Sequence, residues 1–108
     1  MTWAVYYTEQ AEIDLQGVYE YIAYTLLEPE TAKQQARRIM GAADSLDHMP
    51  MRHRLHSSEP WHTRGLRVLP VDNFLVFYLP VEPQHTVAII RIMYGGRDVD
   101  RQLNRVQE

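Results

Sequence analysis

The stretch TVAIIRIMYGGRD, residues 86–98, joins the longest and most apolar predicted strand of the chain to two glycines and an Arg–Asp pair. Residues 86–94 are rich in β-branched side chains and apolar at almost every position, which predicts a strand near the centre of a sheet. Gly95 and Gly96 then allow a sharp turn, because glycine adopts backbone angles that other residues resist. Arg97 emerges at the end of this strand, where it either pairs with Asp98 to fix the turn or contacts a phosphate or a partner protein.

Arg91 is the one charged residue inside this predicted strand. An unpaired buried guanidinium is very costly, so Arg91 must face solvent or meet a carboxylate such as Asp72 or Asp98. Strict alternation along the strand predicts two faces, one with Val87, Ile89, Arg91 and Met93, and the other with Ala88, Ile90, Ile92 and Tyr94.

Two more strands are predicted just before this one, at residues 65–71 and 74–80. Asp72–Asn73 forms the turn between them, and a Pro-containing turn at 80–85 leads into the last strand. Pro70 cannot donate a hydrogen bond within a sheet, so residues 65–71 should form an edge strand or contain a bulge.

The N-terminal half predicts a strand followed by a helical hairpin. Residues 2–7 alternate and are rich in β-formers, and Thr8 is a suitable N-cap for a helix that extends to about Thr25. Pro29 suits the first turn of a second helix over residues 29–46, where apolar side chains recur every three or four residues. With a possible short helix over 98–106, the order is β-α-α-β-β-β. We therefore predict a single α+β domain, residues 1–108, with an antiparallel sheet and the hairpin packed on one face.

Composition limits the function classes. The chain has 108 residues, is 45% hydrophobic and contains no cysteine, which excludes disulfides, zinc–thiolate sites and a cysteine nucleophile. The start of the chain lacks the pattern of a signal peptide, and no apolar run is long enough to span a membrane, so we expect a cytoplasmic protein. No sequence motif indicates a cofactor, and none is expected.

Charge is unevenly distributed, although the net charge is only −3. Residues 1–51 hold eight carboxylates against Lys33 and two arginines, whereas residues 52–108 hold eight arginines against six carboxylates. Arginine suits phosphate and carboxylate partners better than lysine does, so the C-terminal half is the candidate binding half.

The irregular stretch 47–63 carries four of the five histidines. His62, with Arg64 and Arg67, could form a nuclease site in which His62 moves the proton and the arginines hold the phosphate. Alternatively, these histidines are polar and solvated. A metal site is a third possibility, although the spacing fits no strong pattern; its ligands would be His53, His56 and His62.

Two aromatic residues have similarly open roles. Trp61 either stacks on a base or anchors the loop to the core, and Tyr78 is either a core aromatic or a catalytic acid. Together with Arg91, they are the candidate partner-binding residues of the chain.

Three blocks in this order resemble the RelE/ParE superfamily of toxins from type II toxin–antitoxin modules: EQAEIDLQGVYEYIA (9–23), GLRVLPVDNFLVFY (65–78) and RIMYGGRD (91–98). The resemblance covers nearly the whole chain. It implies a helical hairpin on an antiparallel sheet, and a cytosolic growth inhibitor, associated with plasmid stabilisation, that a co-produced antitoxin neutralises. RelE-like members cleave mRNA in the ribosomal A site, whereas ParE-like members poison DNA gyrase.

Comparison with the ribonuclease pattern favours the ParE-like activity. Arg67 and Arg97 match basic positions of the ribonucleases, but Phe74 replaces the usual arginine before LVFY, and no Tyr or His follows Arg97. RelE-like cleavage remains the alternative, with Arg97, Arg67, Arg64 and His62 as its active site. A third possibility is a non-toxic module that receives a peptide at a sheet edge or groove, and the chain could form homo-oligomers or toxin–antitoxin hetero-oligomers.

Overall fold

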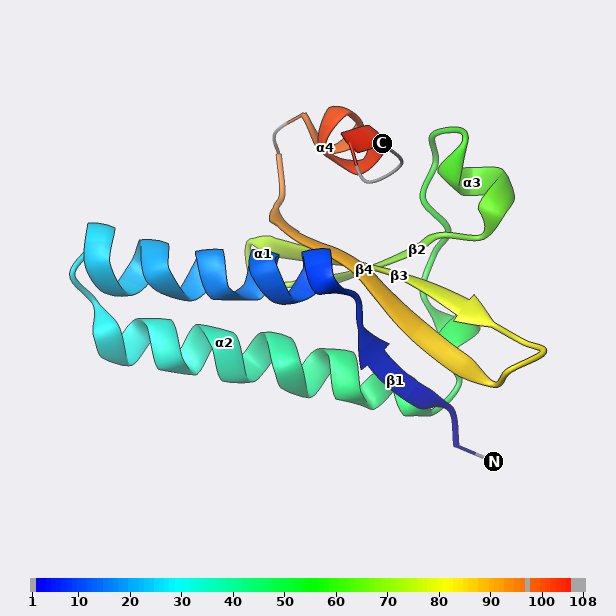
Figure 1. The fold of residues 1–108 in the computed structure, drawn as a ribbon, viewed down its shortest axis with the longest axis horizontal. Coiled ribbons are helices and arrows are strands. Elements are labelled where there is room, and N and C mark those ends of the chain that lie inside the picture. Colours follow the sequence, from blue (N-terminus) through cyan, green and yellow to red (C-terminus); the bar gives the residue numbers. More distant parts are fainter. Residues whose placement is uncertain (1, 97, 106–108) are drawn as a thin grey trace.

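The structure is a computed structural model that describes residues 2–96 and 98–105, with the side chain of residue 105 not described. Its main elements, shown in Figure 1, are β1 (Ala4–Tyr7), α1 (Glu9–Glu20), a π-helical turn (Tyr21–Thr25), α2 (Pro29–Asp44), α3 (Trp61–Arg64), β2 (Arg67–Val71), β3 (Phe74–Val81), β4 (Thr86–Tyr94) and α4 (Val99–Arg105). Two short 3₁₀ turns, Ser45–Asp47 and Pro50–Arg52, follow α2. No helix in this part of the chain is long and apolar enough to cross a membrane.

The sheet has four strands in the order β1-β4-β3-β2. The last three strands are antiparallel, as predicted, and β4 is central while the Pro70-containing β2 lies at an edge. β1 pairs with β4 in parallel, so the sheet is mixed and not wholly antiparallel. The parallel pairing is possible because the whole helical hairpin lies between β1 and the other strands in sequence.

The helical hairpin begins and turns where the sequence predicts. The Thr8 hydroxyl accepts a hydrogen bond from the Ala11 amide at 3.2 Å, and its own proton goes to the Ile89 carbonyl at 2.8 Å. Pro29 opens α2. The first helix is α-helical only to Glu20, after which the π-helical turn occupies the positions that we predicted as α-helix. The hairpin covers one face of the sheet, and Ala11, Ile39, Ala43 and Leu46 are buried against it.

The strict alternation predicted for residues 86–94 is wrong, because a bulge interrupts the β3–β4 pairing between Phe77 and Tyr78. Ile89 and Ile92 therefore share the core under the helical hairpin, while Met93 belongs to a separate core on the opposite face. A bulge inserts one unpaired residue and so exchanges the faces of the residues beyond it.

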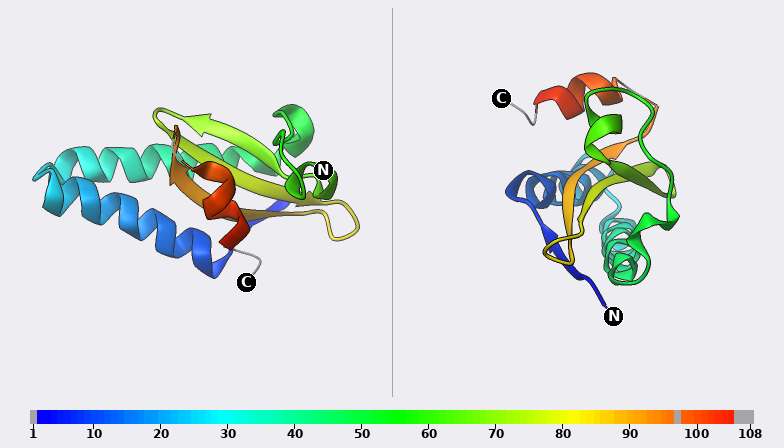
Figure 2. Two further views of the ribbon diagram at one scale, coloured as in Figure 1. Left: turned by 90° about the horizontal axis from the view of Figure 1, so that it is seen from above. Right: turned by 90° about the vertical axis from the view of Figure 1, so that its right-hand side faces the viewer.

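The opposite face of the sheet is also covered. Its core contains Trp61, Leu66, Val68, Phe77, Met93 and Leu103. Trp61 comes from α3 and Leu103 from α4, which lie across the sheet from the hairpin in Figure 2. The final helix predicted for residues 98–106 is therefore present and closes the second layer.

Candidate functional site

Trp61 and Arg64 lie on the short helix α3, beside the second core. Trp61 is buried, with 4% of its surface exposed, and the Arg64 guanidinium carbon lies 5.1 Å from the centre of its ring. The Trp61 ring therefore anchors the loop to the core. This was one of the two roles that the sequence left open, the other being stacking on a base. Arg64 is exposed and covers the ring by a cation–π contact.

His62 lies on the exposed side of α3. Its Nδ1 is 2.9 Å from the His56 carbonyl oxygen, and because a carbonyl only accepts, Nδ1 carries the proton. The other ring nitrogen, Nε2, is then left as a proton acceptor. His62 thus has the tautomer that a general base requires.

The neighbouring His56 holds α4 against the loop. Its ring is buried, and its Nε2 is 2.7 Å from one carboxylate oxygen of Asp100. The other carboxylate oxygen accepts a hydrogen bond from the Ser58 hydroxyl at 3.0 Å. The contact with His56 lowers the pKa of Asp100, and the bond from Ser58 adds to this effect. The His56 side chain thus makes a structural contact that joins the loop before α3 to α4.

Arg67, at the start of β2, is directed to a different set of partners. Its guanidinium donates hydrogen bonds to the carbonyls of Met51 at 3.1 Å and of His53 at 2.7 Å. These bonds brace the loop after α2. The polar contacts of His62, Arg64 and Arg67 in the described structure thus go to three separate partners, and they do not join the predicted trio into one constellation.

Tyr78 is a core residue with no exposed surface. Its hydroxyl donates a 2.6 Å hydrogen bond to the Pro50 carbonyl, and the ring of His53 meets it edge-on. Burial raises the pKa of Tyr78 to about 12. The structure therefore places this predicted partner-binding residue where it supports the loop at residues 50–53, away from any surface that a partner can touch.

Arg91 forms the most buried ion pair among the described residues. Its guanidinium contacts both carboxylate oxygens of Asp14, at 2.6 and 3.0 Å, and donates a third bond to the Gln102 carbonyl. The side chains of Arg91 and Asp14 are 11% and 9% exposed. The prediction of a carboxylate partner is confirmed, but the partners that we named, Asp72 and Asp98, are wrong. Asp14 comes from α1, 77 residues away, and no local pattern in the sequence indicated it.

Arg97 lies outside the described residues. No group of three or more metal-ligating side chains occurs within residues 2–96 and 98–105, so the described histidines do not gather into the metal site considered above.

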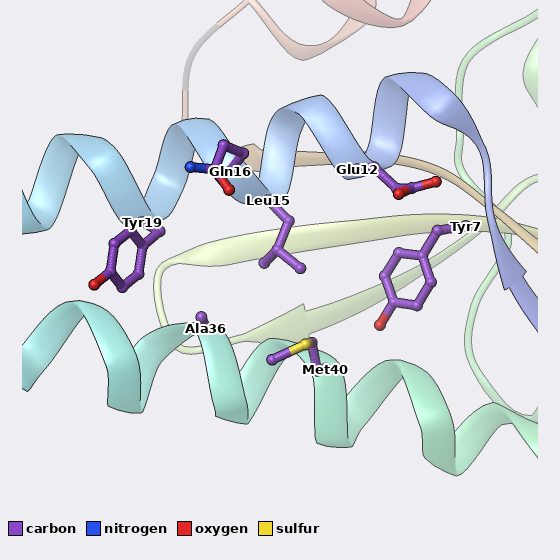
Figure 3. A pocket seen from close by; sticks show the side chains of 7 residues that line it. All are labelled: Tyr7, Glu12, Leu15, Gln16, Tyr19, Ala36 and Met40. Atoms are coloured by element: carbon purple, nitrogen blue, oxygen red, sulfur yellow. The ribbon is translucent and has the colours of Figure 1, made fainter.

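A groove between the two helices of the hairpin, shown in Figure 3, was not indicated by the sequence. Its volume is about 590 Å³, and its lining includes Tyr7, Glu12, Tyr19 and Met40. The Tyr7 hydroxyl is buried without a hydrogen-bond partner in the described structure. Burial, with a smaller effect of the Asp44 carboxylate, raises the pKa of Tyr7 to about 12.

Two tyrosines with raised pKa values predict a loss of stability at alkaline pH. Both titrate near 12 in the folded chain and at their ordinary value of 10 when unfolded, so the unfolded state loses its protons first. The free energy of unfolding should hold up to about pH 10 and fall as the pH rises towards about 12. Urea unfolding across this range, with tyrosinate absorbance to follow ionisation, tests the prediction. Tyr78→Phe should make the decline shallower, and an unchanged slope in that variant would contradict the assignment.

Comparisons with known proteins agree with this architecture. The chromosomal ParDE TA system from P. aeruginosa contains a chain that is 23% identical, with a TM-score of 0.70 over 86% of this chain and 96% of that one. The toxin–antitoxin complex RelBE2 from Mycobacterium tuberculosis contains one that is 20% identical, with a TM-score of 0.61 over 87% of this chain and 99% of that one. A comparison with curated proteins gives no match.

At these identities the two solved structures establish a common fold. Membership rests on the family model described as "ParE toxin of type II toxin-antitoxin system, parDE", which matches residues 5–99. This match spans both helices of the hairpin, β2, β3, β4 and all of β1 except its first residue, so the chain belongs to the ParE toxin family of type II toxin–antitoxin systems.

Proposed function

We propose that this protein inhibits growth by poisoning DNA gyrase, and that a cognate antitoxin holds it inactive in the cytoplasm. Membership of the ParE toxin family supports the toxin role, and the two similar structures both come from toxin–antitoxin systems. A role in plasmid stabilisation is part of the same proposal.

The observation that supports gyrase over mRNA as the target is that two of the predicted nuclease residues, His62 and Arg67, have side chains hydrogen-bonded to different backbone carbonyls. RNA cleavage needs a proton acceptor and phosphate-binding groups around one reacting phosphate. Here the Arg67 guanidinium donates to the carbonyls of Met51 and His53, whereas the ring of His62, on α3, is hydrogen-bonded to the carbonyl of His56 in the preceding loop. A protein that acts by binding to its target does not require these groups to converge.

One observation favours the alternative of a RelE-like mRNA endonuclease. The exposed His62 has its tautomer fixed with Nε2 as a free acceptor, and the exposed Arg64 is two residues away on the same helix. In that mechanism His62 would take or supply the proton, and Arg64, Arg67 and Arg97 would stabilise the phosphate. A non-toxic peptide-binding module is the third candidate.

Induced expression in a bacterium, with labelled precursors of DNA, RNA and protein, distinguishes these functions. We expect DNA synthesis to stop first and the SOS response to rise. His62→Ala should leave the arrest unchanged, because the histidine has no catalytic role in a gyrase poison. Arg97→Ala should relieve the arrest.

The opposite pattern would replace the proposal. If protein synthesis stops first, mRNAs are cut at ribosome-bound codons and His62→Ala abolishes the arrest, the protein is a nuclease. If nothing stops, the peptide-binding module becomes the better description. Full toxicity of Arg97→Ala at normal expression would refute the role of that arginine.

A further inference from the structure

The tip of the helical hairpin carries a concentrated group of exposed apolar side chains. Of the ten large apolar residues that are exposed in the described structure, four lie within residues 21–27: Tyr21, Tyr24, Leu26 and Leu27. Leu27 and Tyr24 are 75% and 70% exposed. Single exposed apolar residues are common on protein surfaces, whereas a group of them marks an interaction site. We call these four side chains the tip cluster.

The tip projects from the body of the protein. In Figure 1 and in the left view of Figure 2, the hairpin continues past the end of the sheet, and the connection between α1 and α2 is its far end. Behind the tip, Phe74 of β3 packs against a small core of Ile22, Ala23 and Ala32. The backbone that carries the tip cluster is thus anchored from within, while the cluster itself faces outward.

The backbone of the tip departs from ordinary helical geometry. In the π-helical turn the Leu26 amide donates to the Tyr21 carbonyl at 3.0 Å, and the Glu28 amide donates to the Ile22 carbonyl at 3.0 Å. π-Helical turns occur frequently at functional sites. Leu27 then has a φ of 58°, a left-handed conformation that costs free energy in residues with a side chain.

The fold itself does not require leucine at position 27. The Leu27 side chain is mostly exposed, and glycine would adopt the same backbone angles without strain. Met49, in the loop after α2, has the same combination of a left-handed backbone and an exposed side chain. What distinguishes Leu27 is the group of exposed aromatic and aliphatic neighbours beside it, which favours a contact outside the chain.

The charge around the tip is of one sign. Residues 20–32 contain Glu20, Glu28 and Glu30 and no lysine or arginine. Glu30 lies 3.6 Å from Lys33, whereas no basic side chain pairs with Glu20 or Glu28 in the described structure. Opposite charges across an interface guide association and select the partner. A surface that receives the tip should therefore be apolar at its centre and basic at its rim.

We infer that the hairpin tip is the part of this toxin that enters its target, with the tip cluster inserted into an apolar cleft of DNA gyrase that has a basic rim. This inference rests on the proposed function. A poison without an assembled catalytic site acts by holding its target, and a projecting tip reaches into a cleft that a flat face cannot enter. An enzyme that binds DNA carries basic surfaces for the phosphates, and these are the charges that Glu20 and Glu28 complement.

A second copy of the chain fits the tip poorly. In a two-fold symmetric dimer the same surface patch meets itself, so Glu20 and Glu28 of one copy would face those of the other. Like charges opposed across an interface disfavour association. Two projecting tips also touch over a small area, whereas stable interfaces bury about 1200–2000 Å². A cleft encloses the tip on several sides and so buries more of the same side chains.

Binding of single variants to purified gyrase, measured by fluorescence anisotropy of the labelled full chain, tests the apolar contact. Leu27→Gly removes one side chain of the tip cluster and should weaken binding about tenfold. Met49→Gly is the matched control, because Met49 has a φ of 46° and is 73% exposed but lies outside the tip. It should bind gyrase as tightly as the unaltered chain.

The basic rim is tested by Glu20→Lys, with Glu82→Lys as its control. Both glutamates are exposed and both substitutions change the net charge equally, but Glu82 lies in the turn between β3 and β4. Glu20 is the last residue of α1, where the helix dipole favours lysine, so the change should not disturb the fold. We expect Glu20→Lys to weaken gyrase binding about tenfold and Glu82→Lys to leave it unchanged.

Melting curves keep folding apart from binding. Leu27→Gly replaces a strained residue with one that adopts its backbone angles freely, so its melting temperature should equal or exceed that of the unaltered chain. Weaker binding without a lower melting temperature cannot be a folding defect. Leu27→Asn is the second variant, since asparagine also tolerates a left-handed backbone, and it should lose binding in the same way.

Several outcomes overturn the inference. One is equal affinity of Leu27→Gly and Met49→Gly for gyrase, and another is equal affinity of the two lysine variants. A dimer of the unaltered chain that Leu27→Gly dissociates would make a second copy the occupant of the tip. Tip variants that bind gyrase normally but escape neutralisation by the cognate antitoxin would make the antitoxin its occupant.

Growth arrest, measured on the same variants, separates this inference from the proposed function. If the unaltered chain binds gyrase and stops DNA synthesis, and Leu27→Gly and Glu20→Lys do so equally well, the tip is refuted and the gyrase poison stands. If the unaltered chain neither binds gyrase nor stops DNA synthesis, the proposed function is refuted, and with it the target assigned to the tip.

Discussion

Asp14→Ala should lower the free energy of unfolding by about 3–5 kcal/mol, as expected when one partner of a buried ion pair is removed. The change leaves the Arg91 guanidinium, 11% exposed, without its counter-charge. It also removes the acceptor of the Ile92 amide, which donates to Asp14 at 2.9 Å. The native stability of a domain is about 5–15 kcal/mol, so this substitution should remove a large share of it. Urea unfolding followed by circular dichroism measures the loss.

Two variants show whether burial is the cause. Arg38→Ala breaks the exposed pair with Asp72, whose nitrogen and oxygen atoms are 2.9 Å apart, and should cost no more than about 1 kcal/mol. Replacing both buried partners, as Asp14→Leu with Arg91→Met, should recover part of the lost stability, because no unpaired charge remains although the Ile92 amide still lacks its acceptor. If Asp14→Ala proves no more damaging than Arg38→Ala, the pair does not have the importance assigned to it.

Tyr78→Ala should cost a similar amount, about 3–5 kcal/mol, because it removes a fully buried aromatic ring and leaves a cavity. Tyr78→Phe keeps the ring and removes only the hydrogen bond to the Pro50 carbonyl. That variant should cost about 1–3 kcal/mol, the cost of leaving a buried acceptor unsatisfied. The difference between the two separates packing from hydrogen bonding, and urea midpoints measure both.

Tyr24→Ala provides the comparison for Tyr78. Tyr24 is 70% exposed in the π-helical turn, so its truncation should change stability by less than about 1 kcal/mol. Equal effects at positions 24 and 78 would mean that Tyr78 does not support the core in the way described. Loosening of the loop at residues 50–53 in Tyr78→Phe should also appear as faster local hydrogen exchange.

Local signals in the sequence were sufficient for the elements and their order. The Thr8 cap, Pro29 at the start of α2, the Asp72–Asn73 turn and the edge position of Pro70 are each consequences of one residue's conformational preference or hydrogen-bonding capacity. The central position of β4 followed from its apolar composition. These features depend on neighbours close in sequence or on burial, and both can be read from a single chain.

The positions of the site residues depend on contacts between distant parts of the chain, which the apolar periodicity of the sequence does not predict. The bulge between Phe77 and Tyr78 exchanges the faces of β4 without any glycine or proline to indicate it. His62, Arg64 and Arg67 lie within six positions in the sequence, yet β2 begins at Arg67 and directs its side chain to the loop after α2.

By itself, the sequence determined the helical hairpin, the strands, the caps and turns, and the family resemblance, since each depends on local conformational preference and on the pattern of apolar residues. Only the tertiary structure decided that Arg91 pairs with Asp14 and that the buried Tyr78 donates its hydroxyl proton to the Pro50 carbonyl. It also decided that Ile13 and Tyr21 are exposed. The physical reason is that pairing and exposure are set by which distant surfaces meet. Asp14 and Arg91 are 77 positions apart, so no preference of neighbouring residues could have predicted their contact.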